Sequence, residues 1–389
     1  MDFHFKNGTA LLSGTLAKAD VCVSNGVFAR QASSSIDVTG YFILPGIIDL
    51  HGDGFERQIA PRPKAMFSQS KALRHIDLEL ASCGVTVAWL AHSWSWEGMK
   101  RSPERAQKFV ATLSGYLEHS MTDLRVQLRC ETHTCDRYTE LMATIEQFGI
   151  DYVVFNNHLP EAKEMFDKAD GSFAAWATDV GRSVEDHVFA YQNAMALSEQ
   201  VEEFLQKTSR DFQRMGIKFG SHDDRDSATR QKFSKLGAKI AEFPTTVEAA
   251  KAARDLGDPI LMGAPNVVRG GSQSGNIAAI DLVKLGLCDV LVSDYYYPSL
   301  SQAAFKLWQD DICSLPKAWA MISENPASVM GLTGIGHIEL GARADLVFVN
   351  TETLQIDATL CRGRFSFITG EMIDRLISAQ MHDLISAAE

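Results

Sequence analysis

No run of 18 apolar residues occurs in the 389-residue sequence, so we expect no transmembrane helix. Residues 1–20 contain no basic segment followed by an apolar stretch, and we expect no secretory signal there. Basic side chains are scarce, since 37 Lys and Arg stand against 49 Asp and Glu and give a net charge of −12. Binding nucleic acid needs a basic excess that neutralises phosphates, so we expect no nucleic-acid partner. The missing apolar run likewise predicts no membrane partner. A small anionic substrate held by a few arginines is compatible with this balance.

Cysteine pairs are also missing. The seven cysteines are odd in number, scattered, and never spaced as Cys-x-x-Cys. These spacings argue against a disulfide framework and against a structural zinc cluster of cysteines. We therefore expect a reducing, cytoplasmic location. The composition, 46% hydrophobic and 22% charged, is typical of a globular protein, and the length suits one large α/β domain with a small satellite.

The amino-terminal segment carries signs of short β-strands. Its apolar stretches are separated by the dipeptides Asn7-Gly8 and Asn25-Gly26, which are typical of hairpin turns. Residues 1–41 are therefore predicted to form a small β-module.

The carboxyl-terminal segment has a similar pattern. A turn at residues 341–345 precedes an apolar strand at 346–349. We predict that residues 337–389 rejoin residues 1–41, so that a small β-sandwich domain forms from both ends of the chain.

Between these ends, short apolar runs alternate with helical patterns. The predicted strands are 42–50, 85–91, 124–131, 152–157, 217–221, 238–242, 259–263 and 289–294. One predicted helix, 70–83, ends before Gly84, as helices commonly do. Eight alternations over residues 42–336 predict an α/β fold, a (β/α)8 TIM-type barrel, with a doubly wound open sheet as the alternative. The polar-helical segment 159–216 is predicted to be an excursion over the mouth of the barrel.

Polar residues directly follow several of the predicted strands. In a barrel the carboxyl ends of all strands meet at one rim, where catalytic groups lie. The candidate metal ligands at this rim are His51, Asp53, Glu131, His158, His222 and Asp294. Imidazole nitrogens and carboxylate oxygens are ligands that Zn²⁺ or a similar divalent ion prefers. Six such groups suit two ions better than one, and two ions can share and activate one water.

Each of these residues also has a structural interpretation. A single histidine at a strand end is more often a hydrogen-bonded structural residue than a ligand. Glu131 has an alternative as the salt-bridge partner of Arg129 or Arg137. His92, which follows another apolar strand, is either a substrate contact or a structural residue.

A second group of residues is suited to phosphate. Arginines hold phosphate oxygens in bidentate fashion, and a glycine-rich loop that opens a helix presents free backbone N–H groups. The candidate substrate-binding residues are Arg57, Arg62, Asn266, Arg269, Gly270, Gly271 and Ser272. The alternative is that Gly270-Gly271 only turns the chain and that Arg62 lies in a surface loop.

Several strings resemble known families. The stretch Leu44-Pro45-Gly46-Ile47-Ile48-Asp49-Leu50-His51, with the closing Gly341-Ala342-Arg343-Ala344-Asp345-Leu346-Val347, resembles the amidohydrolase superfamily. Further strings, in order along most of the chain, resemble the phosphonate-metabolism protein M family. They are His51-x-Asp53 with Ala60-Pro61-Arg62-Pro63, Arg129-Cys130-Glu131, Ser221-His222-Asp223-Asp224, Glu242-Phe243-Pro244-Thr245-Thr246, Met262-Gly263-Ala264-Pro265-Asn266 with Arg269-Gly270-Gly271-Ser272, and Ser293-Asp294-Tyr295-Tyr296.

The resemblance implies an activity. Members of that family hydrolyse α-D-ribose 1-methylphosphonate 5-triphosphate and release pyrophosphate. The resemblance also implies a binuclear barrel site in which Glu131 takes the place of the bridging carboxylated lysine of many relatives. The chain departs from the family pattern at Asn157, where the family has Asp, and at Gln273, where it has His. Both departures affect expected substrate contacts rather than the candidate ligands.

The leading hypothesis is a metal-dependent phosphoanhydride hydrolase with two divalent ions, Zn²⁺ first and Fe or Mn as alternatives. Asp294 is the predicted catalytic residue, which orients the attacking water and takes its proton. One alternative keeps the metal site but cleaves an amide or cyclic amide. Another is a non-catalytic scaffold. The expected partner is a small anionic substrate, and we expect a homo-oligomer.

Overall fold

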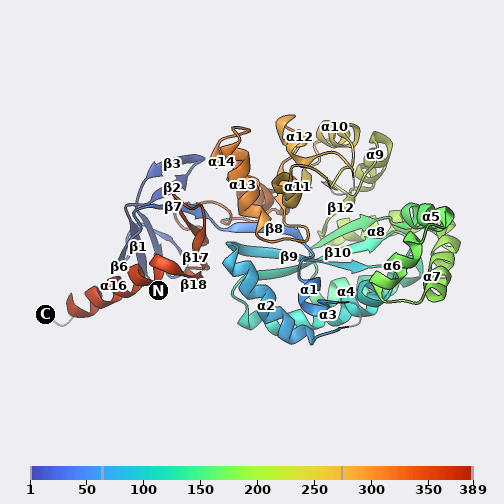
Figure 1. Cartoon of the computed structure of the whole chain (residues 1–389), viewed down its shortest axis with the longest axis horizontal. Coiled ribbons are helices and arrows are strands. Elements are labelled where there is room, and N and C mark those ends of the chain that lie inside the picture. Colours follow the sequence, from blue (N-terminus) through green and yellow to red (C-terminus); the bar gives the residue numbers. More distant parts are fainter. Residues whose placement is uncertain (1, 63–64, 273–274, 387–389) are drawn as a thin grey trace.

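The structure, a computed structural model, describes residues 2–62, 65–272 and 275–386. Its centre is a sheet of eight parallel strands hydrogen-bonded in chain order (Figure 1). The strands are β8 (Ile47–Gly52), β9 (Val85–Trp94), β10 (Asp123–Glu131), β11 (Tyr152–Asn156), β12 (Lys218–His222), β13 (Ile240–Glu242), β14 (Ile260–Gly263) and β15 (Val290–Val292). The sheet closes because the Asp294 N–H donates to the His51 carbonyl at 2.9 Å and the Asp53 N–H donates to the Asp294 carbonyl at 2.8 Å. This closure confirms the predicted barrel and excludes the open sheet.

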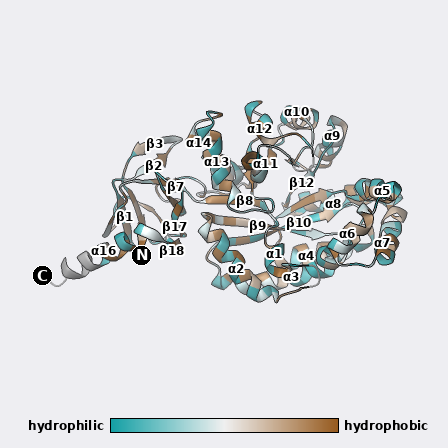
Figure 2. Cartoon of the chain, viewed as in Figure 1, coloured by the Kyte–Doolittle hydropathy of each residue, from teal (hydrophilic) through white to brown (hydrophobic). Residues whose placement is uncertain are grey.

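Helices surround the barrel. They are α1 (Glu56–Ile59), α2 (Gln69–Ser82), η1 (Met99–Arg101), α3 (Pro103–Tyr116), η2 (Leu117–His119), η3 (Cys135–Arg137), α4 (Tyr138–Phe148), η4 (Ser198–Gln200), α8 (Val201–Met215), α9 (Ser227–Leu236), α10 (Val247–Asp255), α11 (Ala264–Arg269), α12 (Ala279–Lys284), α13 (Ser299–Gln309), α14 (Leu315–Ala320) and α15 (Glu324–Met330). The predicted helix 70–83 corresponds to α2, which ends before Gly84 at a φ of +81°, a conformation suited to glycine. Figure 2 shows brown, apolar strands enclosed by helices of mixed colour, as expected for a buried parallel sheet. In the described part of the chain, no helix has the length and apolar character needed to span a membrane.

The predicted excursion is helical. It contains α5 (Leu159–Lys168), α6 (Ser172–Val180) and α7 (Val184–Ala196), which lie at the end of the molecule remote from both termini (Figure 1). The last helix of the predicted segment 159–216, α8, instead packs into the barrel core, so the excursion ends earlier than predicted. Phe173 and Tyr191 form part of a separate small apolar cluster. Trp96, which follows β9, packs against that cluster and so ties the excursion to the barrel.

The two chain ends form two sheets around a shared apolar core, which confirms the predicted sandwich. One sheet has the order β5-β4-β1-β6, with β1 (Phe3–Lys6), β4 (Val21–Ser24), β5 (Val27–Ala29) and β6 (Ser34–Asp37). The other has the order β18-β17-β16-β7-β2-β3, with β2 (Thr9–Leu12), β3 (Thr15–Lys18), β7 (Tyr41–Pro45), β16 (Leu346–Asn350), β17 (Ile356–Cys361) and β18 (Arg364–Ile368). Helix α16 (Gly370–Ser386) follows and buries Met372 against this core.

One of the two predicted hairpins is wrong. Asn25-Gly26 joins the antiparallel pair β4 and β5 as predicted, with positive φ at both residues. Asn7-Gly8 instead leads from β1 in one sheet to β2 in the other. A Cβ at Gly8 would lie 2.6 Å from the Ile43 side chain, so glycine here permits a close crossing through the core rather than a hairpin.

The single predicted strand 42–50 is also wrong. The chain divides at Gly46, because β7 pairs with β2 and β16 in the sandwich while β8 begins the barrel. A Cβ at Gly46 would lie 2.3 Å from Thr86 Oγ1, so the chain passes there without room for a side chain. Residues 42–45 therefore belong to the sandwich and not to the predicted barrel 42–336, whereas the boundary between 336 and 337 remains a prediction.

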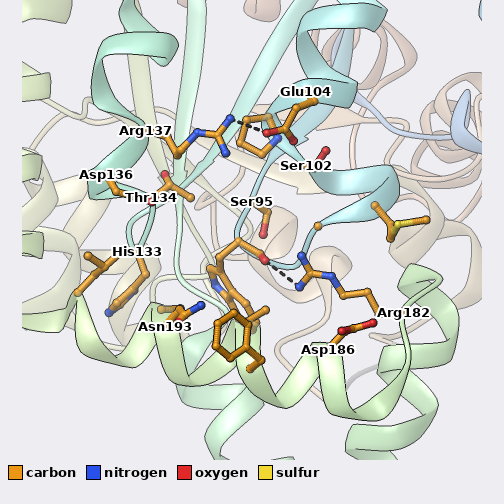
Figure 3. Close-up of a pocket in the computed structure, with 18 of the residues that line it drawn as sticks. Ser95, Ser102, Glu104, His133, Thr134, Asp136, Arg137, Arg182, Asp186 and Asn193 are labelled. Atoms are coloured by element: carbon orange, nitrogen blue, oxygen red, sulfur yellow. Dashed lines mark hydrogen bonds and ion pairs between the residues drawn. The ribbon is translucent and has the colours of Figure 1, made fainter.

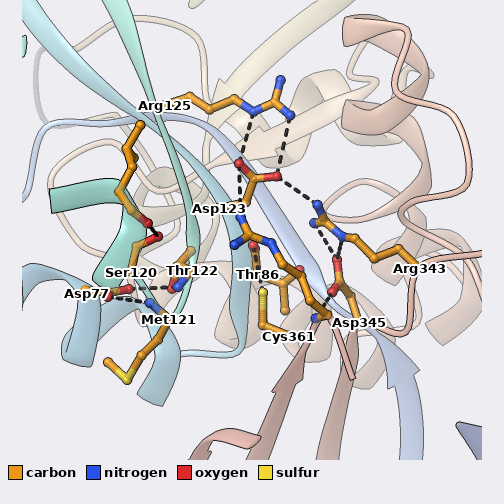
Figure 4. Close-up of polar contacts among 12 residues, drawn as sticks. Asp77, Thr86, Ser120, Met121, Thr122, Asp123, Arg125, Arg343, Asp345 and Cys361 are labelled. Atoms are coloured by element: carbon orange, nitrogen blue, oxygen red, sulfur yellow. Dashed lines mark hydrogen bonds and ion pairs between the residues drawn. The ribbon is translucent and has the colours of Figure 1, made fainter. Parts of the chain in front are cut away.

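A polar network joins the sandwich to the barrel (Figure 4). Arg343 donates to Asp123, the first residue of β10, at 2.8 Å, and forms an ion pair of 2.6 Å with Asp345. The Cys361 thiol donates to the carbonyl of Thr86, near the start of β9, at 3.5 Å. The sandwich is therefore attached at the amino ends of these strands, opposite the rim that carries the site.

We expect Gly220→Ala to destabilise the fold. In β12 a Cβ at Gly220 would lie 2.3 Å from the Ile240 carbonyl oxygen, a backbone atom that cannot move without disturbing the β12–β13 pairing. Overpacking of this kind costs about 1–3 kcal/mol. Gly115→Ala is the matched control, because Gly115 is an exposed helical glycine with nothing within 4 Å, and alanine there should add up to about 1 kcal/mol. Urea unfolding of both variants measures the difference, and equal midpoints would refute the steric argument.

Candidate metal centre

Three of the predicted ligands meet where the barrel closes. His51 lies at the end of β8, and Asp53 and Asp294 follow β8 and β15. One donor atom from each lies within 4.8 Å of the others. Asp294 has a φ of +54°, a left-handed conformation that aspartate tolerates better than most residues. Burial raises the pKa of the Asp53 and Asp294 carboxyls, opposed by nearby Arg129 and His51.

A buried carboxylate orients His51. Glu242 Oε2 lies 2.9 Å from His51 Nδ1, and its Oε1 accepts hydrogen bonds of 2.6 Å from both Gln127 and Tyr152. Since a carboxylate only accepts, Nδ1 of His51 carries a proton, and in the neutral ring the lone pair of Nε2 would be available to a metal. His222 stands beside His51 with ring centroids 5.5 Å apart, and both histidines lie within reach of Glu242.

Glu131 and His158 belong to a second group. Glu131 Oε1 lies 2.5 Å from His158 Nδ1, and Glu97 Oε1 lies 3.2 Å from the same nitrogen. Burial opposes protonation of His158, but the two glutamates raise its pKa to about 10. Glu97 also accepts hydrogen bonds from Arg101 at 2.8 Å and from Trp176 of α6 at 2.9 Å, so the excursion is anchored at this group.

The six predicted ligands fall into close groups of three: His51 with Asp53 and Asp294, His51 with His222 and Glu242, and Glu131 and His158 with Glu97. His51, Asp53, His222 and Asp294 line one cavity of about 270 Å³, whereas Glu131 and His158 lie with Glu97. A bridging role for Glu131 stays a prediction. The salt-bridge alternative for Glu131 is wrong. Arg129 pairs with Asp53 at 3.3 Å, while Arg137 pairs with Glu104 and Glu140.

The donors fit divalent ions. Each group mixes imidazole nitrogen with carboxylate oxygen, the chemistry that zinc and similar ions take. Glu131 Oε1 and His158 Nδ1 are buried and close together, yet neither has a hydrogen bond of normal geometry within the described part of the chain. These atoms without hydrogen bonds, together with Nε2 of His51, are suited to serve as ligands of one ion beside His51 and one beside Glu131. The number and identity of the ions remain predictions.

Only some of the candidate substrate residues lie at the cavity beside His51. Asn266, Arg269, Gly271 and Ser272 line the same cavity as His51, and Arg269 donates to the Tyr295 hydroxyl at 3.2 Å. Asn266 Oδ1 accepts from the Ala279 N–H at 2.9 Å, which fixes the direction of its amide.

The other candidate substrate residues lie elsewhere. Arg57 forms an ion pair with Glu79 and donates to the Tyr295 carbonyl at 2.8 Å, while Arg62 is exposed. Neither arginine lines the cavity at His51. Arg57 lines the neighbouring cavity instead, and a substrate-binding role for the two arginines stays a prediction. Pro63, Lys64, Gln273 and Ser274 lie outside the described residues.

The glycine loop does not open a helix. Gly270 is the carboxyl-terminal cap of α11, at a φ of +80°. Its N–H donates to the Val267 carbonyl and that of Gly271 to the Asn266 carbonyl, so both donors are already used. The turn interpretation is the correct one for Gly270-Gly271, and side chains rather than this backbone must contact an anion.

Sequence reasoning missed several residues of the site. Glu242 ends a predicted strand, the same signal that selected the other ligands, but no role was assigned to it. Glu97 had no such signal, because the predicted strand 85–91 stops short of the observed end at Trp94. Arg101 and Arg129 also line the cavity beside His51. His92 is buried, with Nδ1 3.0 Å from the Ser93 carbonyl oxygen, and it contacts the rings of Phe55 and Phe109. It also lines a neighbouring cavity, so its role stays a prediction.

The fold is shared with solved hydrolases. The N-acetylglucosamine-6-phosphate deacetylase of Pasteurella multocida matches with a TM-score of 0.62 at 12% identity, over 94% of this chain and 99% of that one. The dihydropyrimidinase of Brevibacillus agri NCHU1002 matches with a TM-score of 0.60 at 13% identity, over 95% of both chains. The sequence model of the Amidohydrolase family matches residues 172–364. The solved structures define the fold, and the family model, which matches about half of the chain, indicates the amidohydrolase class.

A curated relative narrows this class. Over 383 residues the chain is 31% identical to the α-D-ribose 1-methylphosphonate 5-triphosphate diphosphatase of Escherichia coli (strain K12), covering 93% of this chain and 99% of that protein. The chain therefore belongs to the amidohydrolase superfamily and, within it, to the phosphonate-metabolism protein M family.

Proposed function

We propose that this protein hydrolyses a ribose 5-triphosphate, α-D-ribose 1-methylphosphonate 5-triphosphate or a close analogue, to the 5-phosphate and pyrophosphate. The observation that carries the proposal is the cavity at the barrel rim. Its lining includes His51, Asp53 and Asp294 together with Arg129, which pairs with Asp53, and Arg269. A cavity that combines metal-type donors with two guanidiniums suits a polyphosphate better than a neutral amide. The 31% identity to the diphosphatase supports the same substrate class.

The residues have separate tasks in this proposal. His51, Asp53, His222 and Asp294 would hold one ion, and Glu97, Glu131 and His158 a second. Divalent ions in these positions supply a water of lowered pKa and neutralise phosphoryl charge. Asp294 orients the attacking water and takes its proton as the oxygen bonds to the phosphorus nearest the ribose.

The leaving group needs its own stabilisation. The bond from that phosphorus to the bridging oxygen breaks, and the bridging oxygen leaves with pyrophosphate, which carries the electron pair. Arg129 and Arg269 neutralise the developing charge, and Asn266 and Ser272 offer further polar contacts in the same cavity. Arg57, Arg62 and Gly270 have no part in this proposal, because their donors lie elsewhere or are already used.

A second candidate function is hydrolysis of an amide or cyclic amide at the same site. It is favoured by the shared fold with a deacetylase and a dihydropyrimidinase, although that likeness concerns the fold alone. A non-catalytic scaffold is the third possibility, and fewer than one metal ion per purified chain would favour it.

The test is a product assay. We expect pyrophosphate release from α-D-ribose 1-methylphosphonate 5-triphosphate, loss of that activity after dialysis against a chelator, and recovery when Zn²⁺, Mn²⁺ or Fe²⁺ is returned. N-acyl amino acids and dihydropyrimidines serve as the matched alternative substrates. Amine or ring-opened product without pyrophosphate would replace the proposal with the second candidate.

A further inference from the structure

A second cavity adjoins the one at the metal centre. Its volume is about 470 Å³, within the usual range for small-molecule sites. Asp53 and Tyr295 line both cavities, so the two cavities are neighbours at these residues. We name it the aromatic cavity. Its distinctive lining residues are Phe55, Ile59, Met66, His92, Arg105 and Tyr296.

The walls of the two cavities differ in chemistry. The cavity at His51 is lined by arginines, carboxylates and amides together with a few apolar residues. The aromatic cavity combines apolar and aromatic side chains with two carboxylates and three cations, Arg57, Lys100 and Arg105. Arg57 and Lys100 are already paired with carboxylates, and the apolar walls cannot compensate the charges of a triphosphate. They suit the carbon faces of a sugar ring, and the exposed Tyr296 ring offers such a surface. The sugar end of a substrate therefore belongs in the aromatic cavity.

One cation in the aromatic cavity has no anionic partner. Arg57 is paired with Glu79, and Lys100 lies 3.7 Å from Glu56 and 3.4 Å from Asp179. The guanidinium of Arg105, in the first turn of α3, has neither an ion pair nor a side-chain hydrogen bond within the described residues. A half-buried guanidinium without a carboxylate partner beside apolar walls is suited to a ligand anion.

We propose that Arg105 and the aromatic cavity bind an anionic group on the sugar, remote from the triphosphate, and so select substrates that are charged at both ends. The proposal rests on the proposed function, because it assigns the triphosphate to the cavity at His51. The chemical class is a sugar 5-triphosphate whose anomeric oxygen carries a phosphonate or phosphate group. Arg105 contacts that group in bidentate fashion and determines specificity without touching the reacting phosphorus.

The first test compares two substrates that differ in one anion. For α-D-ribose 1-methylphosphonate 5-triphosphate, Arg105→Ala should raise KM about 10–100-fold with kcat unchanged, as expected for loss of a charged hydrogen bond that acts on binding alone. For ribose 5-triphosphate, which lacks the second anion, KM should change less than about twofold. Arg105→Lys should restore part of the affinity, because lysine keeps the positive charge but cannot form the bidentate hydrogen bonds of a guanidinium.

Arg182→Ala is the matched control. Arg182 is another half-buried arginine, in a neighbouring cavity lined also by Ser95, Asp186 and Asn193 (Figure 3). It donates to the Trp96 carbonyl at 3.1 Å, and that cavity includes neither Asp53 nor Tyr295. Its loss should leave both KM values unchanged. Equal effects of Arg105→Ala on both substrates, or no effect on either, would overturn the proposal, as would equal turnover of a nucleoside triphosphate by the wild-type protein.

A binding measurement separates this proposal from the proposed function. If the wild-type protein releases pyrophosphate from neither substrate, the proposed function fails. Calorimetry with ribose 1-methylphosphonate then tests independently whether the aromatic cavity binds the anionic sugar. At least tenfold weaker binding to Arg105→Ala than to the wild-type protein supports the site. Equal binding to both proteins, or no binding to either, refutes it.

Discussion

Asp294→Asn is expected to lower kcat for pyrophosphate release by at least about 10³-fold, within the range that a positioned acid–base group contributes. Asparagine has nearly the same shape and tolerates the φ of +54° at this position, so the backbone hydrogen bonds to His51 and Asp53 that close the barrel are kept. What is lost is a group that can take the proton of the attacking water. Assays of pyrophosphate release, with metal content measured on the same sample, check the result.

The control for this variant is Asp311→Asn. Asp311 also has a φ of +54° but is exposed and lies after α13, away from the rim. It should keep full activity, which separates the chemistry of Asp294 from any effect of asparagine on a left-handed residue. Activity of Asp294→Asn within tenfold of wild type would remove Asp294 from the proposed mechanism. Loss of bound metal in that variant would assign it a ligand role alone.

Glu242→Ala is expected to damage both stability and metal binding. The carboxylate is fully buried and accepts hydrogen bonds from His51, Gln127 and Tyr152, all of which would lose their partner. Breaking a buried pair in this way costs about 3–5 kcal/mol. Because Glu242 also orients His51, metal affinity should fall about 10–100-fold. Urea unfolding and metal titration measure the two effects.

Tyr152→Phe is the matched control for Glu242. It removes one donor to the same carboxylate oxygen and leaves the contact with His51 intact. We expect a loss of about 1 kcal/mol and unchanged metal affinity. If Glu242→Ala and Tyr152→Phe lowered metal affinity equally, the orienting role of Glu242 toward His51 would be wrong.

The architecture and most of the candidate ligands could be predicted from local sequence pattern. Alternating apolar runs and helices define a barrel, and parallel strands bring their carboxyl ends to one rim. His51, Asp53, His222 and Asp294 could therefore be found as polar residues that end or directly follow buried strands, and they line one cavity. The paired φ-positive residues Asn25-Gly26 likewise specify a turn locally. These features depend on neighbours within a few positions of the chain.

Tertiary structure alone decided which charges meet. Arg129 pairs with Asp53 although the two residues belong to different strands, and Glu242 contacts His51, which is 191 residues away in the sequence. Glu97 lies beside Glu131 and follows β9, whose end the sequence analysis placed too early. Such pairings cannot be predicted from the spacing of residues along the chain, because each depends on where the closed barrel places the ends of separate strands. The same reason explains why the sequence did not reveal the contacts of Arg57 and Gly270. The guanidinium of Arg57 pairs with Glu79, and the N–H of Gly270 donates to a carbonyl of α11. The local sequence pattern determines which side chains lie at the rim of the barrel. Tertiary packing determines which of them keep donor or acceptor atoms that can bind a metal ion or a substrate.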